Sequence, residues 1–255
     1  MKSRKYFGFT LAEVLITLGI IGVVAAMTIP TLIEKYKIAT LHASFNKTYA
    51  VIQQALKITM QELEINNSGD FAIYYNKDKN VLQQNFIEIN NIWVKNFQGA
   101  TKINKAYLSK NRVYIHDFWG NTLPYAYSYP VNGTIPDNTF LILPNGAQIS
   151  YIGYDGNVNY QQSIALVIFF DTNGPFKGPN RIGYDMFYYY GDGTQHSYYL
   201  APSCLPLDSA INGYWQAIQM STCSLYAIKN INPYDSSKKY WDSLYKPKSW
   251  WKKLK

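Results

Sequence analysis

The fold of this chain is decided by residues 9–33, FTLAEVLITLGIIGVVAAMTIPTLI. The stretch holds 25 residues and one charged side chain, Glu13. A helix rises about 1.5 Å per residue, so the run is long enough to cross the roughly 30 Å hydrocarbon core of a bilayer. Three basic residues lie within the first five positions. This charge pattern predicts that residues 1–8 stay in the cytoplasm and that the chain after residue 33 lies outside.

Glu13 separates this run from an ordinary secretory signal peptide. A signal peptide has a shorter apolar region and a cleavage site of small residues, whereas here the apolar run continues past two alanines to Ile33. A carboxylate inside a membrane helix costs several kcal/mol, so we expect it to have a partner. The sequence holds no other charged residue between Lys5 and Glu34. Within one helix the remaining neutralising group is an N-terminal amine, which requires that the chain be cut just before Phe9.

The residues around this point resemble a known leader. Lys5–Glu13, KYFGFTLAE, is similar to the type III leader of type IV prepilins and type II secretion pseudopilins. In that family a membrane-bound prepilin peptidase cuts after the glycine and methylates the new N-terminal residue. The resemblance implies cleavage between Gly8 and Phe9, methylation of Phe9, and pairing of Glu13 with the Phe9 amine of a neighbouring subunit in a filament. The alternative is a plain single-span anchor with an isolated glutamate.

The same resemblance implies partners and a location. The chain would be stored as a single-pass protein of the inner membrane, with its head periplasmic or extracellular. An inner-membrane assembly platform would then build it into a pilus or pseudopilus with copies of itself or other pilins. The chain is large beside typical main pilins, which favours a minor pilin or a pseudopilin. The choice between secretion, adhesion, motility and DNA uptake stays open.

Two residues that weaken helices fall inside the apolar run. Glycine costs about 1 kcal/mol in a helix interior and proline about 3 kcal/mol. Gly22 and Pro30 occupy positions where related pilins carry them, and there the stretch between them can lose its helical form in the filament. We therefore expect a bend or a melted segment between Gly22 and Pro30. The alternative is the ordinary tolerance of glycine and proline in membrane helices.

An amphipathic helix is expected to continue the apolar run over residues 34–66. Apolar side chains recur at steps of three and four residues, and lysines and glutamines lie off that stripe. The polar residues 66–70 are expected to end the helix near Ile65. The stripe predicts the face that packs on the rest of the protein; it consists of Ile38, Leu41, Phe45, Tyr49, Ile52, Leu56 and Leu63.

Residues 70–255 are expected to form one globular head, which gives an α+β fold with the long helix laid on a small antiparallel sheet. Val81–Phe97 is ambiguous between a short helix and an irregular connection. Short apolar runs separated by turn residues predict an antiparallel sheet of about four strands, drawn from five candidate runs. These are the two arms of a hairpin around Pro144-Asn145-Gly146, the run Ile164–Phe170, the run Asp185–Tyr190 and its return His196–Leu200.

One loop of the head is a candidate calcium site. Asp171, Asn173, Asn180 and Asp185 offer oxygen atoms, which calcium prefers as ligands, and interspersed glycines allow sharp turns. The spacing is not that of an EF-hand, since no glutamate closes the loop. Some pseudopilins use a loop calcium. The alternative is that these side chains cap turns by bonding local backbone amides.

The C-terminal part carries two further candidates. Cys204 and Cys223 would pair in an exported head, and their placement resembles the C-terminal disulfide loop of type IV pilins; two separate buried thiols are the alternative. The segment Lys238–Lys255 alternates lysines with aromatic residues. Such a tail is suited to nucleic acid or to an anionic membrane surface, and the alternative is a solvated terminus with no ligand.

Composition argues against catalysis. The chain has only three histidines, and neither a nucleophile motif nor a phosphate loop is present. The net charge of +8 is concentrated near the two ends, so a uniform nucleic-acid surface is not implied. We therefore expect that this chain has no enzymatic activity. The remaining rival is a membrane-anchored, extracytoplasmic binding module for DNA or glycans that never polymerises, and such a module has no need of Glu13 or of the Gly8-Phe9 junction.

Overall fold

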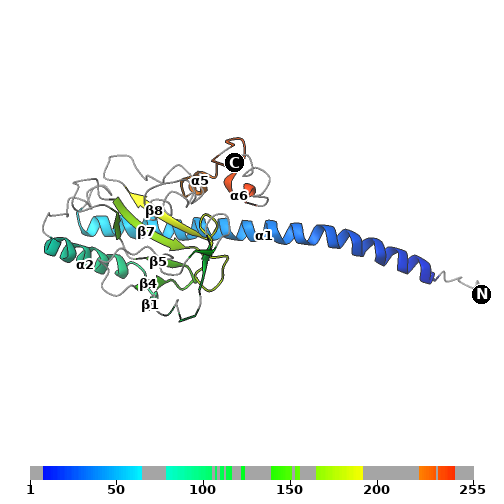
Figure 1. Ribbon diagram of the computed structural model, residues 1–255, viewed down its shortest axis with the longest axis horizontal. Coiled ribbons are helices and arrows are strands. Elements are labelled where there is room, and N and C mark those ends of the chain that lie inside the picture. The colour runs from blue at the N-terminus through cyan, green and yellow to red at the C-terminus, as the bar shows by residue number, and fades with distance from the viewer. Residues whose placement is uncertain are drawn as a thin grey trace, which may run out of the picture.

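A long helix with a globular head on its C-terminal half makes up the computed structural model (Figure 1). The structure describes residues 8–64, 79–104, 107, 110–111, 113–116, 122–123, 139–150, 153–155, 165–191, 224–233 and 235–244. The helices are α1 (Leu11–Glu62), α2 (Lys79–Lys95), α5 (Ser224–Lys229) and α6 (Tyr240–Ser243). The strands are β1 (Thr101–Asn104), β2 (Ile115–His116), β3 (Thr122–Leu123), β4 (Thr139–Ile142), β5 (Gln148–Ser150), β6 (Gly153–Asp155), β7 (Ala165–Asp171) and β8 (Met186–Gly191).

Helix α1 runs unbroken for 52 residues, about 78 Å at the usual rise. It ends at Glu62, slightly before the expected end near Ile65, because Glu64 has a positive φ of 56° that no helix continues. Pro30 lies inside the helix, which curves gently in this half (Figure 1). The isolated chain therefore has no melted segment between Gly22 and Pro30, and loss of helix there stays a prediction for the filament.

The C-terminal half of α1 packs on the head by the expected stripe. Leu41, Phe45, Ile52 and Leu56 are buried, while Ile38 and Tyr49 are half-buried against the same core. The stripe is broader than expected, because small and hydroxyl residues between its apolar members are also buried. These are Thr48, Ala55 and Thr59. Their small side chains let the helix backbone approach the sheet and α2.

Six antiparallel strands form the main sheet, in the order β1-β4-β5-β7-β6 with β8 on the other edge of β7. The expected hairpin is β4 and β5, and the two expected apolar runs are β7 and β8. Strands β1 and β6 were not expected, because both are short and neither shows an apolar alternation. The expected return strand His196–Leu200 lies outside the described residues.

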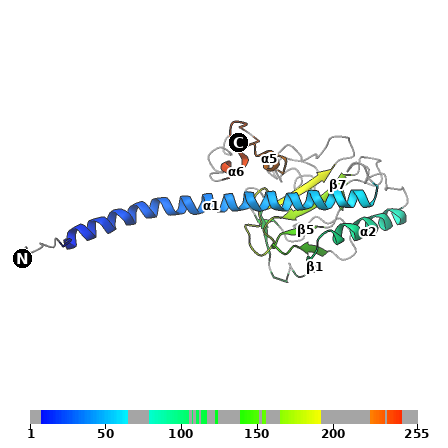
Figure 2. The same ribbon diagram turned by 180° about the vertical axis from the view of Figure 1, so that it is seen from behind.

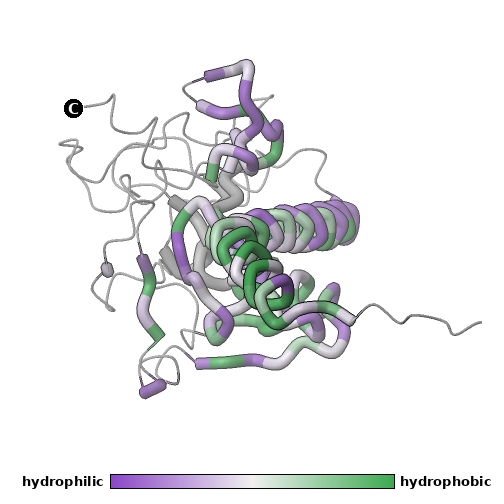
Figure 3. Tube along the Cα trace, turned by 90° about the vertical axis from the view of Figure 1, so that its right-hand side faces the viewer, coloured by the Kyte–Doolittle hydropathy of each residue, from purple (hydrophilic) through white to green (hydrophobic). Residues whose placement is uncertain are grey.

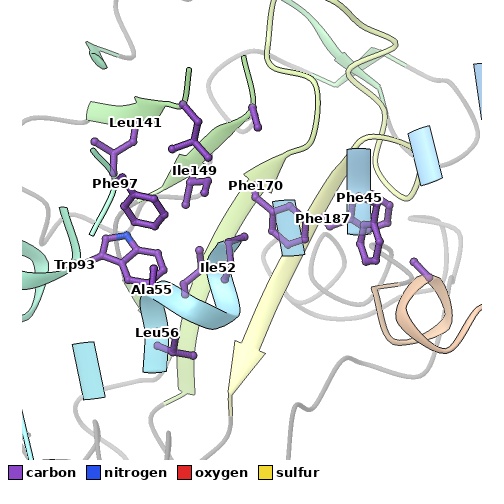
Figure 4. Packing of buried hydrophobic residues seen from close by; sticks show 14 of the residues in the cluster. Phe45, Ile52, Ala55, Leu56, Trp93, Phe97, Leu141, Ile149, Phe170 and Phe187 are labelled. Carbon is purple, nitrogen blue, oxygen red and sulfur yellow. The ribbon is translucent and has the colours of Figure 1, made fainter. Parts of the chain in front are cut away.

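Register sets which residues face the helix. Leu141, Ile149, Phe170 and Phe187 stand opposite one another across β4, β5, β7 and β8, so they form one row on one face of the sheet. All four are buried and pack with Phe45 and Ile52 of α1 (Figure 4). The Phe45 ring lies 4.6 Å from the Phe187 ring and 6.0 Å from the Phe170 ring. This row is the centre of the core.

Helix α2 covers the far end of α1, which settles the ambiguity of Val81–Phe97 in favour of a helix (Figure 2). Trp93 is fully buried, and its indole donates a hydrogen bond of 3.2 Å to the Ser150 carbonyl. The Asn96 amide donates to the Thr59 hydroxyl at 2.9 Å. These two bonds tie α2 to the sheet and to α1.

Helices α5 and α6 lie at the end of the head from which the free half of α1 emerges (Figures 1 and 2). Trp241 stacks on His42 with 4.9 Å between ring centroids and lies 5.3 Å from the Phe45 ring. Its indole donates to the Ala227 carbonyl at 3.2 Å. Burial of Trp241 therefore fixes α5 and α6 to the first buried turn of α1.

Candidate assembly helix and loop site

The N-terminal half of α1 projects from the head (Figures 1 and 2). It is the one helix, among the residues that the structure describes, that is long and apolar enough to cross a membrane. Its large side chains are exposed, as shown by Leu11 at 78%, Met27 at 72% and Leu32 at 68%. Hydrophobic residues predominate along this half in Figure 3. Such a surface is stable only in lipid or against other protein chains.

The Gly8-Phe9 peptide lies just outside the helix. Phe9 is 89% exposed, and a Cβ atom on Gly8 would meet no atom within 4 Å. The helix begins after Thr10, whose extended backbone has φ −79° and ψ 149°. A peptide bond in this position is accessible, and cleavage there stays a prediction.

Glu13 has a partner within its own chain. One carboxylate oxygen accepts the Thr10 backbone N–H at 2.8 Å and the Thr10 hydroxyl at 2.8 Å. The Thr10 hydroxyl in turn accepts the Glu13 N–H at 3.3 Å, which completes a capping box. Sequence reasoning considered only charged partners and missed Thr10, although a hydroxyl residue three positions before a glutamate is the signature of this cap. Hydrogen bonds reduce the cost of the carboxylate in lipid but leave its charge without a counter-charge.

The candidate loop site lies between β7 and β8. Asp171 Oδ1 accepts the backbone N–H groups of Asn173 at 3.1 Å and Gly174 at 2.8 Å. The Asp185 carboxylate accepts those of Asn180 at 2.8 Å and Arg181 at 2.6 Å. The structure thus brings the four expected residues into one loop, closed by the Thr172 N–H donating to the Asp185 carbonyl at 2.8 Å.

Both carboxylates of the loop are buried, at 0% exposure each. Burial raises the pKa of Asp171 well above its usual range, and the neighbouring Asp185 raises it further. Burial also raises the pKa of Asp185 to about 7, against the opposing effect of the N–H groups of Arg181 and Asn180. Two adjacent acids with raised pKa values mark a place where negative charge is poorly compensated.

The loop is held against its surroundings on two sides. Gly174 has a positive φ of 87°, and a Cβ atom there would overlap the Gly146 carbonyl oxygen at the tip of the β4–β5 hairpin. The buried Tyr240 hydroxyl of α6 donates to the Gly183 carbonyl at 2.6 Å. The loop is therefore a packed part of the head.

Several candidates from the sequence lie outside the described residues. Cys204 and Cys223 are among them, so the disulfide stays a prediction. The same holds for the tail from residue 245 onward. Lys238, where the tail was taken to begin, forms an ion pair of 2.7 Å with Asp235.

Comparison with protein families gives one match. Residues 3–29 match the family model of the prokaryotic N-terminal methylation motif, which is the prepilin-type motif of type IV pilins and pseudopilins. The matched residues include the exposed Gly8-Phe9 peptide and Glu13. No curated protein and no solved structure matches the chain. The chain thus carries the prepilin-type motif on an α+β, pilin-like fold.

Proposed function

We propose that this chain is a structural subunit, a minor pilin or a pseudopilin, of a type IV pilus or a type II secretion pseudopilus. The observation that carries the proposal is the matched methylation motif at the start of an exposed apolar helix, with the cleavage peptide outside that helix. Prepilin peptidase would cut between Gly8 and Phe9 and methylate Phe9. The subunit would wait in the inner membrane as a single-pass protein with its head outside.

Assembly follows from the chemistry of the first turn. Cleavage creates an amine on Phe9, four positions before Glu13. In the stored subunit the capping box with Thr10 satisfies the carboxylate by hydrogen bonds. A charged side chain at membrane depth still costs about 2.5 to 3.5 kcal/mol on insertion scales. Pairing with the Phe9 amine of a neighbour removes that cost, so it favours assembly and sets the stagger between subunits.

The size of the head supports a minor pilin or a pseudopilin over a main pilin. A main pilin repeats at every position of the filament, so a head as large as this one would crowd its neighbours. The non-polymerising binding module for DNA or glycans is less well supported, because the methylation motif has no use in it. Nucleic-acid binding through Lys238–Lys255 stays a prediction, with Lys238 already paired to Asp235.

The test is mass spectrometry of the N-terminal peptide from the native membrane. We expect a peptide that begins at N-methylated Phe9. A Gly8→Val variant should keep its leader, because the peptidase requires a small residue there. A Gly19→Ala variant is the matched control, since a Cβ atom at Gly19 meets nothing within 4 Å, and it should be processed normally. An intact leader in the wild-type protein would overturn the proposal.

A second measurement separates the two kinds of filament. Filaments sheared from the cell surface should contain the processed chain if it is a pilus subunit. If it is a pseudopilus subunit, it should stay with the membrane fraction and co-purify there with the secretion platform.

A further inference from the structure

The sheet face that points away from α1 buries a polar pair. Gln148 of β5 and Asp171 of β7 stand directly opposite each other in the antiparallel register. Residues in such a pair have their side chains on the same face, with Cβ atoms about 5 Å apart. Both residues are 0% exposed. The Gln148 carboxamide therefore lies beside the Asp171 carboxylate in the interior of the head.

This pair has unused hydrogen-bonding atoms. Neither the Gln148 amide oxygen nor its amide nitrogen has a hydrogen-bond partner within the described part of the chain, and the same is true of Asp171 Oδ2. A fully buried carboxamide with no partner is rare in native proteins, because its loss of hydration is uncompensated. Gln148 lies on a different strand from the loop, so its unpartnered amide is an observation independent of the acidic residues.

The loop adds two more oxygens of the same kind. The amide nitrogen of Asn173 donates to the Gly178 carbonyl at 2.7 Å, and that of Asn180 donates to the Pro175 carbonyl at 2.9 Å. These bonds fix both carboxamides, whose Oδ1 atoms are buried without a partner. Asn180 also has a left-handed backbone with φ 49°. The loop therefore presents amide oxygens, and not amide nitrogens, as its free groups.

Within the described part of the chain, the groups that stabilise the two carboxylates are neutral. Asp171 and Asp185 accept backbone N–H groups of the loop, and no basic side chain of the described residues is among the groups that lower their pKa values. The guanidinium of Arg181, a basic residue of the same loop, lies 4.1 Å above the centre of the Tyr184 ring. The site thus combines negative charge, oxygen acceptors and burial, which is the chemistry that a hard cation takes.

We propose that a calcium ion binds between β5 and the β7–β8 loop. Asp171 and Asp185 supply the charge, and the amide oxygens of Asn173, Asn180 and Gln148 supply neutral ligands. Calcium accepts such a mixed, irregular set of six to eight oxygens, whereas magnesium requires near-ideal octahedral geometry and keeps its waters. The ion fastens the loop to the hairpin strand β5. This inference does not depend on the proposed function, because it concerns the head alone.

The experiment uses the full chain in detergent micelles, stripped with a chelator and then titrated with calcium in a calorimeter and in thermal unfolding. Two carboxylates place the dissociation constant near that of extracellular modules, about 0.1 to 1 mM. We expect heat of binding and a rise in the melting temperature of about 5 to 10 °C near saturation. Magnesium at equal concentration should give less than half of that rise. Absence of any response to 10 mM calcium, or an equal response to magnesium, would overturn the proposal.

Variants assign the ligands. Asp171→Asn should abolish the calcium response, and its calcium-free melting temperature should equal or exceed that of the wild type, because a buried like charge is removed. Gln148→Met keeps the volume and should weaken calcium binding about tenfold without lowering the calcium-free melting temperature. Asp235→Asn, which removes a half-buried acid elsewhere in the head, is the matched control and should respond as the wild type does. If Asp171→Asn fails to fold, Gln148→Met decides, and unchanged calcium affinity in that variant contradicts the assignment.

Discussion

The two halves of α1 differ in what covers their apolar side chains. The half before Ile38 projects from the head and exposes its apolar side chains, whereas the half after it is buried by the sheet and by α2. Both halves belong to one unbroken helix, so backbone geometry does not distinguish them. The second half is stabilised by packing against other parts of the same chain. The apolar side chains of the first half can be covered only by molecules outside the chain, and in the proposed function these are first lipid and then other subunits.

The largest effect should come from the centre of the head. Phe45→Ala removes a fully buried ring that contacts Phe170, Phe187 and Trp241. Such a truncation costs about 3 to 5 kcal/mol, so the melting temperature of the head should fall by about 10 °C. Ile20→Ala, in the exposed half, is the control and should leave the melting temperature unchanged. Thermal unfolding in detergent checks both variants, and a similar loss from Ile20→Ala would show that the halves are not independent.

A backbone substitution in the loop should come next. Gly174→Ala places a Cβ atom against the Gly146 carbonyl, at a φ of 87° that alanine disfavours. We expect a loss of about 2 to 3 kcal/mol, measured by urea unfolding of the head. Gly19→Ala, in the exposed half, should have no effect on the same measurement. Tolerance of Gly174→Ala would mean that the loop and the hairpin tip separate easily.

Substitutions in the first turn of α1 test whether the charge of Glu13 or its hydrogen bonds to Thr10 drive assembly. Glu13→Gln keeps an oxygen that accepts from Thr10 but removes the charge, whereas Thr10→Val removes the cap and keeps the charge. If charge pairing between subunits drives assembly, Glu13→Gln should reduce incorporation into filaments at least tenfold, about 1.4 kcal/mol. Thr10→Val should reduce incorporation less. Both variants should leave the melting temperature of the head unchanged, and incorporation is measured by immunoblotting of isolated filaments.

The smallest effect concerns His42, where the two halves of α1 meet. Burial lowers the pKa of His42, with an opposing effect from Asp242 and a supporting one from Lys239. A lowered pKa means that the folded state binds a proton less readily than the unfolded state, whose pKa is about 6.5. The contribution of His42 is therefore complete above pH 6.5 and is lost as the pH falls below it. A His42→Phe variant should keep the stack on Trp241 and show a flatter stability profile between pH 7 and pH 5; an unchanged profile would assign the pH dependence elsewhere.

Features that depend on a local pattern of residues could be predicted from the sequence. The apolar run and the stripe from Leu41 to Leu56 follow from hydrophobicity and periodicity, and the buried face of α1 confirms the stripe. The leader around Gly8-Phe9 was recognised by its resemblance to prepilin leaders, and the matched motif confirms that resemblance. Cleavage between the two residues stays a prediction. The hairpin and the strands β7 and β8 were recognisable because they are apolar and bounded by turns.

Contacts that depend on how the strands are aligned could not be predicted from the sequence. Gln148 alternates with apolar neighbours, a pattern that is typical of a strand with one face in water. It is nevertheless fully buried, on the same face of the sheet as Asp171 at the start of the β7–β8 loop. Its position beside Asp171 exists only once β5 and β7 are aligned. That alignment could not be read from the sequence, because β5 and β7 are not joined by a short turn that would set their register.

The contact between α6 and α1 has a consequence for the order of folding. Trp241 packs on His42 and Phe45, which lie some two hundred residues earlier in the chain. Bringing these segments together closes a loop of about 200 residues, and contacts between residues so distant in sequence form slowly because the entropy of loop closure opposes them. The first buried turn of α1 therefore stays uncovered on that side until late in folding. During that interval the Phe45 ring is exposed, so aggregation of this chain should depend on how fast α6 docks.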